Sequence, residues 1–120
     1  MTEDLNTYDE IKQAVEEGKG ITTVYAASLR EAEGAGRLTL GINEKISRSL
    51  ASRGLGHVPF KPSDLPTSQW SEVRIFDKTT PLGAVILAAH QVGEDEDAKL
   101  REAVDSTATA LLDQVRTLLA

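Results

Sequence analysis

The sequence predicts a mainly α-helical fold with one small β-hairpin, in which a core of helices and hairpin is flanked by an N-terminal and a C-terminal helix. Three observations predict this class. Apolar residues recur at steps of three and four along most of the chain, which is the period of an amphipathic helix. Residues 55–76 break this period and are rich in glycine and proline, which is typical of short strands and turns. The chain of 120 residues, 40% of them apolar, has the size and composition of about one globular domain.

Two short helices are expected in the first third of the chain. The first runs from a polar cap at Asn6 or Thr7 to the glycines near position 18. Its apolar positions are Tyr8, Ile11 and Val15. The second runs from a cap at Thr22 or Thr23 to the glycine-containing turn at residues 34–36. Its apolar positions are Val24, Ala27, Leu29 and Ala32.

A third helix is expected from about Leu40 to Arg53, followed by Gly54 as a cap. Its apolar residues Ile42, Ile46 and Leu50 are four apart and lie on one face. The face opposite them is polar. We therefore expect this helix to be buried on one side and exposed on the other.

A hairpin is expected after the third helix. The segment 55–60 is too short and too rich in glycine and proline for a helix, so it predicts a strand. Residues 61–68 contain two prolines and predict a loop. Residues 70–76 alternate partly between apolar and charged side chains, as a half-buried strand does. Trp70, beside this loop, is expected to pack the hairpin onto the core, and the alternative is an exposed tryptophan that anchors a partner.

Two more helices complete the chain. A cap at residues 79–80 and a proline at position 81 favour a helix over residues 82–89, although residues 84–87 also suit a buried strand. Four acids at positions 94–97 precede a long helix over residues 97–119. Its apolar stripe is Leu100, Val104, Thr107, Leu111, Val115 and Leu118. We expect two parts, residues 1–93 and a C-terminal helix in residues 94–120.

The charge is distributed unevenly. Residues 1–18 carry six acids against one lysine, and residues 79–120 carry seven acids against three bases. Residues 19–78 instead carry nine bases against six acids. Phosphate binding draws its affinity from clustered lysine and arginine. The basic middle is therefore the part suited to nucleic acid, and the acidic ends are not.

The composition argues against several kinds of chemistry. With no cysteine there is no thiol catalysis, disulfide or cysteine-ligated metal, and two histidines separated by 32 residues leave little for a histidine site. We expect no metal, no cofactor and no enzymatic activity. His57 is expected to have a structural role. The chain has no apolar run long enough for a membrane span, and its acidic start is the reverse of a secretory signal, so we expect a cytoplasmic protein without membrane contact.

Residues 20–78 resemble a known family. The segments ITTVYAASLREAEGAGR, LGINEKISRSLASRGLG and HVPFKPSDLPTSQWSEVRIF have the order helix, tight turn, helix, strand, loop and strand. In this order they resemble a winged helix-turn-helix domain. The resemblance implies that the helix over residues 40–53 enters the major groove of DNA and that the loop from Lys61 to Trp70, the wing, contacts the adjacent backbone.

The candidate DNA-binding residues follow from the polar face of the third helix. At 100° per residue, the buried face centres near Ile46, and the charged and hydroxyl side chains lie on the far side. We expect double-stranded DNA to be contacted by Arg37, Asn43, Lys45, Ser47, Arg48, Ser52, Arg53 and Lys61.

Two functions suit this sequence. The first is a small DNA-binding protein, either a transcriptional regulator or a DNA-organising factor. The second is a protein-interaction adaptor of the same fold that does not bind DNA and makes contacts through its acidic ends. For the first we expect a homodimer through residues 97–119, because this helix carries more apolar surface than one face needs. The alternative is that residues 82–89 and the first helix cover that surface within one chain.

Overall fold

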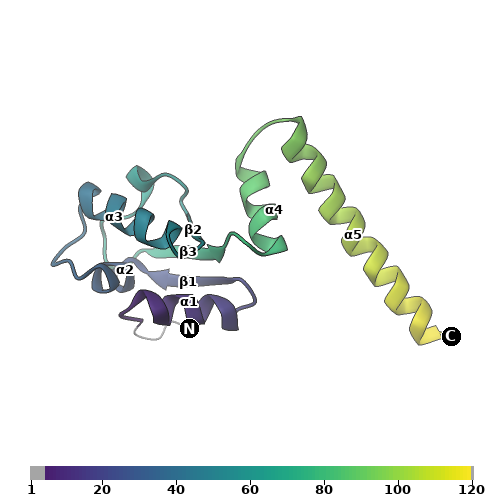
Figure 1. The fold of residues 1–120 in the computed structure, drawn as a ribbon, viewed down its shortest axis with the longest axis horizontal. Helices are drawn as coiled ribbons and strands as arrows, with labels where there is room; N and C mark the ends of the chain where they lie inside the picture. The colour runs from purple at the N-terminus through teal and green to yellow at the C-terminus, as the bar shows by residue number, and fades with distance from the viewer. Residues whose placement is uncertain (1–4, 120) are drawn as a thin grey trace. The chain divides into compact units, whose positions relative to one another are not determined.

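The computed structural model describes the backbone of residues 5–119 and the side chains of these residues except those of 106–109. The chain divides into two compact units at Gly83 and Ala84 (Figure 1). The first unit holds α1 (Tyr8–Glu17), β1 (Ile21–Tyr25), α2 (Ala26–Glu33), α3 (Leu40–Ala51), β2 (Leu55–Val58), a short 3-10 helix η1 (Pro62–Asp64) and β3 (Glu72–Asp77). Helix α4 (Pro81–His90) begins at the end of this unit, and α5 (Glu94–Leu119) belongs to the second. The expected division into residues 1–93 and 94–120 stays a prediction.

The first helix begins and ends where the sequence predicts. The Thr7 hydroxyl oxygen accepts a hydrogen bond from the backbone N–H of Glu10 at 3.1 Å, which satisfies one of the free donors at the helix start. The Glu10 carboxylate in turn accepts a hydrogen bond from the backbone N–H of Asn6, the residue before the cap, at 3.2 Å. The helix ends at Gly18, and positive φ angles at Lys19 and Gly20 turn the chain into β1.

The expected start of the second helix is wrong. Residues 21–25, which were expected to cap and begin a helix, form strand β1 and pair antiparallel with β3. Helix α2 starts only at Ala26 and has no side-chain cap. The N–H groups of Ala26 and Ala27 instead donate to the carbonyl oxygens of Ser71 and Gln69, both at 2.8 Å. The helix start is therefore fixed by a segment more than forty residues away.

The mainly helical fold and the small antiparallel sheet are confirmed, but the sheet has three strands in the order β1-β3-β2. The expected hairpin is its β2–β3 half, in which Leu55 pairs with Asp77 and His57 pairs with Ile75. Residues 81–90 form a helix, which confirms the favoured reading over the strand. Helix α5 starts at Glu94, so the four acids form its first turn.

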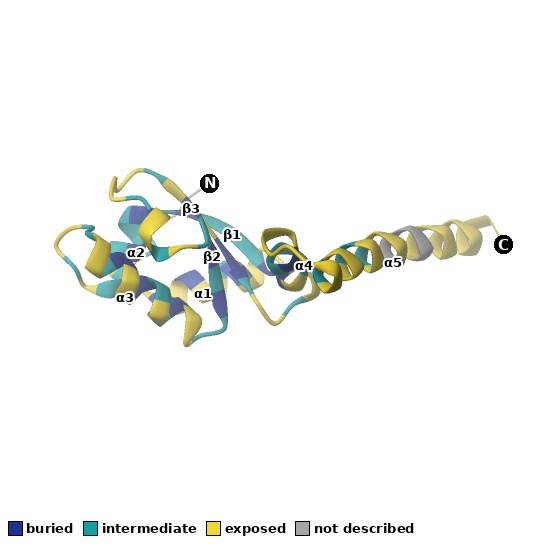
Figure 2. Cartoon of the chain, turned by 90° about the horizontal axis from the view of Figure 1, so that it is seen from above, coloured by how far each residue is buried: buried dark blue, intermediate teal, exposed yellow. Residues whose placement is uncertain are grey.

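The core lies between one face of the sheet and helices α1, α2 and α3. Val73 and Ile75 of β3 are fully buried there, together with Ile46 and Leu50 of α3. Figure 2 shows buried segments of the strands and of α1, α2 and α3 in dark blue. Figure 1 shows α1 along β1 and α3 along β2. Trp70 does not join this core. Its side chain is 66% exposed, so the expectation that it packs the hairpin is wrong.

A smaller aromatic cluster lies on the other face of β3. The Phe76 ring is fully buried and meets the Phe60 ring edge-on, with centroids 6.2 Å apart. Gly56 of β2 lies against the same ring, and a Cβ atom there would come within 2.5 Å of Phe76. The glycine therefore leaves the space that the phenyl ring fills.

No helix within residues 5–119 has the length and apolar character needed to cross a bilayer.

Candidate nucleic-acid interface

Helix α3 presents a buried face and an exposed face. The Thr39 hydroxyl oxygen caps it by accepting from the Ile42 N–H at 3.1 Å. Its buried residues are Asn43, Ile46 and Leu50. The opposite face carries two cations and a hydroxyl, Lys45, Arg48 and Ser52, together with Glu44. We call Lys45, Arg48 and Ser52 the outer face of α3.

The cations of the outer face are exposed and unpaired. Among the side chains that the structure describes, no carboxylate lies within ion-pair distance of Lys45 or Arg48. At 1.5 Å per residue, positions 45, 48 and 52 span about 10 Å along one side of the helix. Arg37 in the turn before α3 and Lys61 after β2 are also exposed. The outer face thus has the charge and hydrogen-bonding groups needed to bind an anionic ligand.

Asn43 does not belong to this surface, which corrects the expectation for this residue. Its side chain is 2% exposed, and its Nδ2 group donates to the carbonyl oxygens of Leu65 at 3.2 Å and Pro66 at 3.3 Å. At 100° per residue Asn43 lies about 20° from Leu50, so the helical period places it on the buried side. Its role is to hold the segment between β2 and β3 against α3.

Ser47 also turns inward. Its hydroxyl oxygen lies 2.8 Å from Nε2 of His57, and Nδ1 of the same ring lies 2.6 Å from the Pro59 carbonyl oxygen. A carbonyl only accepts, so Nδ1 carries the proton of the neutral ring and Nε2 accepts from the Ser47 hydroxyl. Burial lowers the pKa of His57 below its ordinary value, which favours this neutral form. The pair joins α3 to β2 and leaves Ser47 committed within the fold.

Arg53 lies at the end of α3 toward the first helix. Its guanidinium carbon lies 4.5 Å from the centroid of the Tyr8 ring, a cation–π contact, and Nη1 donates to the Ser49 carbonyl oxygen at 2.9 Å. The Tyr8 hydroxyl in turn donates to Glu33 at 2.7 Å. Arg53 is half-buried and joins α3 to α1. It is therefore not placed on the outer face.

The loop between β2 and β3, expected to be the wing, packs against α3. Leu65 is buried in the core cluster, and η1 contacts α3. Together with the Asn43 hydrogen bonds, these contacts fix the first half of the loop. Lys61 stands exposed just before η1 and so lies beside the element that touches α3.

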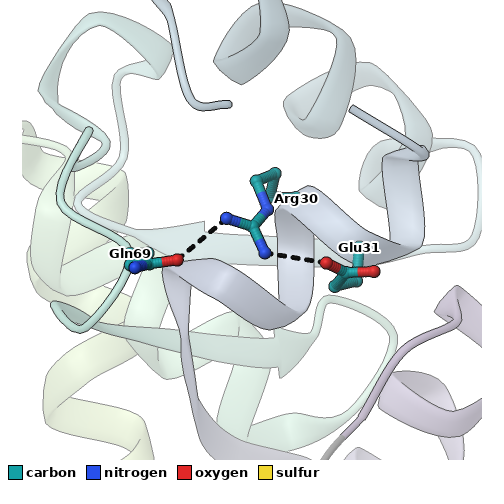
Figure 3. A network of polar contacts seen from close by, with 3 residues as sticks. All are labelled: Arg30, Glu31 and Gln69. Atoms are coloured by element: carbon teal, nitrogen blue, oxygen red, sulfur yellow. Dashed lines mark hydrogen bonds and ion pairs between the residues drawn. The ribbon is translucent and has the colours of Figure 1, made fainter. Parts of the chain in front are cut away.

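The second half of this loop holds a polar cluster that sequence reasoning missed (Figure 3). Arg30 of α2 donates through Nη1 to the side chain of Gln69 at 2.8 Å and pairs through Nη2 with Glu31 at 2.7 Å. Trp70 is next in sequence and meets the Tyr25 ring edge-on, with centroids 5.7 Å apart. The sequence did contain a sign that Trp70 is exposed. It lies between Gln69 and Ser71, outside the alternation of apolar and charged residues that marks the strand.

Comparison with protein-family models, curated proteins and solved structures found no match for this chain. Among the described residues, no group of three or more histidine and carboxylate side chains is arranged to hold a metal ion.

Proposed function

We propose that the protein binds double-stranded DNA through the outer face of α3 and acts as a transcriptional regulator or a DNA-organising factor. The observation that carries this proposal is the position of Lys45 and Arg48, which are exposed on the side of α3 that faces away from the core. Among the described side chains, neither forms an ion pair with a carboxylate. The order of α2, turn, α3, β2, loop and β3 supports it, because a winged helix-turn-helix domain has the same order.

The chemistry of the outer face suits a major groove. An α-helix fits this groove, which is about 12 Å wide. Lys45 supplies a point charge for a phosphate, whereas the planar guanidinium of Arg48 suits two parallel hydrogen bonds to a phosphate or to a guanine edge. Arg37 and Lys61 add cations before and after the helix. The Ser52 hydroxyl donates to the Ser49 carbonyl oxygen at 2.8 Å, so its proton is used within the helix. Glu44 repels phosphate and limits the affinity.

We also propose that the protein works as a homodimer through residues 97–119 of α5. The exposed apolar side chains Val104, Leu111 and Val115 support this, since water-exposed apolar surface of this extent is typical of an interface. A two-fold dimer contains two copies of α3, the helix proposed to enter the major groove, so it suits a DNA site made of two half-sites.

The salt dependence of binding tests the DNA proposal. If the cations replace about four phosphate counterions, the logarithm of the association constant falls against the logarithm of salt concentration with a slope of about −3 to −4. Fluorescence anisotropy of a labelled duplex, read over a range of salt concentrations, gives this slope. Failure to bind any duplex at low salt, native genomic fragments included, overturns the proposal.

A second candidate function, the protein-interaction adaptor, is favoured by Trp70. An exposed tryptophan beside a second aromatic ring is a frequent anchor of protein interfaces. For an adaptor, Trp70→Ala abolishes capture of a protein partner and duplex DNA does not bind. For the DNA-binding protein, duplex affinity persists in Trp70→Ala.

A further inference from the structure

Helix α5 carries an apolar stripe that the second unit leaves exposed. Val104, Leu111, Val115 and Leu118 are 49% to 85% exposed, and Leu100 continues the stripe at its start. At 100° per residue these five residues fall within an arc of about 60°. The opposite side of the helix is charged and includes Glu102 and Asp113.

The stripe does not wind around the helix. From Leu100 to Leu118 it covers 18 residues in five turns, or 3.6 residues per turn, which is the period of a straight α-helix.

The stripe reads nearly the same in both directions. Leu100 and Leu118 lie nine residues on either side of position 109, and Val104 and Val115 lie five and six residues from it. An antiparallel copy centred there places Leu100 beside Leu118 and puts Val104 within one residue of Val115. Such self-complementarity is what a two-fold interface requires.

The charge of α5 separates the two possible orientations of a helix pair. Its first turn holds four acids, Glu94 to Asp97, whereas the segment after residue 110 holds only one acid, Asp113, and one base, Arg116. A parallel pair brings the two acidic turns together, and like charges repel. An antiparallel pair puts the two acidic turns at opposite ends of the pair and also aligns the helix dipoles favourably.

From the symmetric stripe and the asymmetric charge we infer that α5 docks onto α5 of a second copy of this chain as an antiparallel pair. Val104 then faces the partner's Val115, and Leu100 faces the partner's Leu118. The inference deepens the dimer of the proposed function by giving its orientation, and it is independent of DNA binding.

Disulfide trapping tests this orientation, because the chain has no cysteine of its own. We suggest two full-length variants, Val104→Cys and Val115→Cys, oxidised separately and as an equimolar mixture. A disulfide needs Cα atoms about 4.4–6.8 Å apart, whereas positions 104 and 115 are about 16 Å apart along the helix. Only an antiparallel pair therefore links position 104 to the partner's position 115.

The expected result is at least about tenfold more mixed disulfide than either symmetric disulfide, and little linkage when each variant is oxidised alone. The matched control mixes Glu102→Cys with Asp113→Cys on the charged side, where the pair leaves both thiols unlinked. Symmetric disulfides at each position indicate a parallel pair and overturn the inference. So does equal linkage in the control, or a wild-type chain that sediments as a monomer at tens of micromolar.

Duplex binding by the reduced variants separates this inference from the proposed function. Mixed disulfide without duplex binding leaves the antiparallel pair standing and refutes the DNA proposal. Duplex binding by a chain that is a monomer or forms symmetric disulfides refutes the antiparallel pair alone.

Discussion

Asn43 was predicted to contact DNA because of its residue type, although its position on the helix indicates burial. The helical period puts it beside Leu50, on the buried side, and the structure confirms that geometry. A buried amide must find partners, and the carbonyl groups of Leu65 and Pro66 supply them from a distant loop. The sequence contains no local sign of these partners, so the role of Asn43 could not be predicted.

Replacing Asn43 by alanine is expected to lower the free energy of unfolding by about 1–3 kcal/mol, because it removes the donor shared by the carbonyl groups of Leu65 and Pro66. Urea denaturation followed by circular dichroism measures the change. Lys45→Ala on the outer face is the control, with an expected effect within about 0.5 kcal/mol. Equal stability of the two variants contradicts the role given to Asn43.

Two glycines are expected to respond to alanine in opposite directions. Gly56→Ala pushes a methyl group into the Phe76 ring and should lower the free energy of unfolding by about 1–3 kcal/mol. Gly41 lies in the first turn of α3 with no contact for a Cβ closer than 4.0 Å. Gly41→Ala should raise the free energy of unfolding by up to about 1 kcal/mol, since alanine favours the helix. Thermal denaturation of both variants checks this, and a neutral Gly56→Ala would count against the aromatic cluster.

Among the helices and strands, the sequence predicted those whose ends are set by contacts between residues close together in the chain. The threonine cap at position 7 begins α1 as the sequence indicates, and the β2–β3 hairpin follows from its glycines and alternation. The cap at Thr39 that begins α3 was not predicted. The segment 21–25 was misread because its apolar residues fit a helix as well as a strand. Pairing with β3 decides it, and that partner lies some fifty residues further along the chain.

The contact between α3 and β2 is expected to make stability depend on pH. Burial lowers the pKa of His57 below 6.5, so the unfolded chain takes up a proton more readily than the folded one. The free energy of unfolding should be greatest above pH 6.5 and should fall as the pH drops toward the lower pKa of the folded state. Urea denaturation at pH 7.5 and pH 5.5 measures this loss.

A His57→Gln variant should lose less stability between these pH values than the wild type does. If His57→Gln retains the full pH dependence, another group is responsible.

For the whole molecule, the uneven charge distribution was more informative than the net charge of −6. The count of charges by segment shows an excess of bases in the middle of the chain, where Lys45, Arg48 and Lys61 are exposed. The same count could not show that Ser47 and Arg53 are engaged within the fold, because their partners, His57 and Tyr8, come from other elements. Charge thus predicts a candidate surface, and tertiary contacts decide which residues remain on it.

The most direct test of the central claim compares duplex binding by three full-length proteins over a range of salt concentrations: the wild type, Arg48→Ala and Lys12→Ala. Lys12 is an exposed lysine on α1, away from the outer face of α3. The account predicts that Arg48→Ala weakens binding and flattens the slope of log association constant against log salt by about one unit, while Lys12→Ala keeps the wild-type slope. An unchanged slope for Arg48→Ala, or an equal loss for Lys12→Ala, would contradict binding through the outer face of α3.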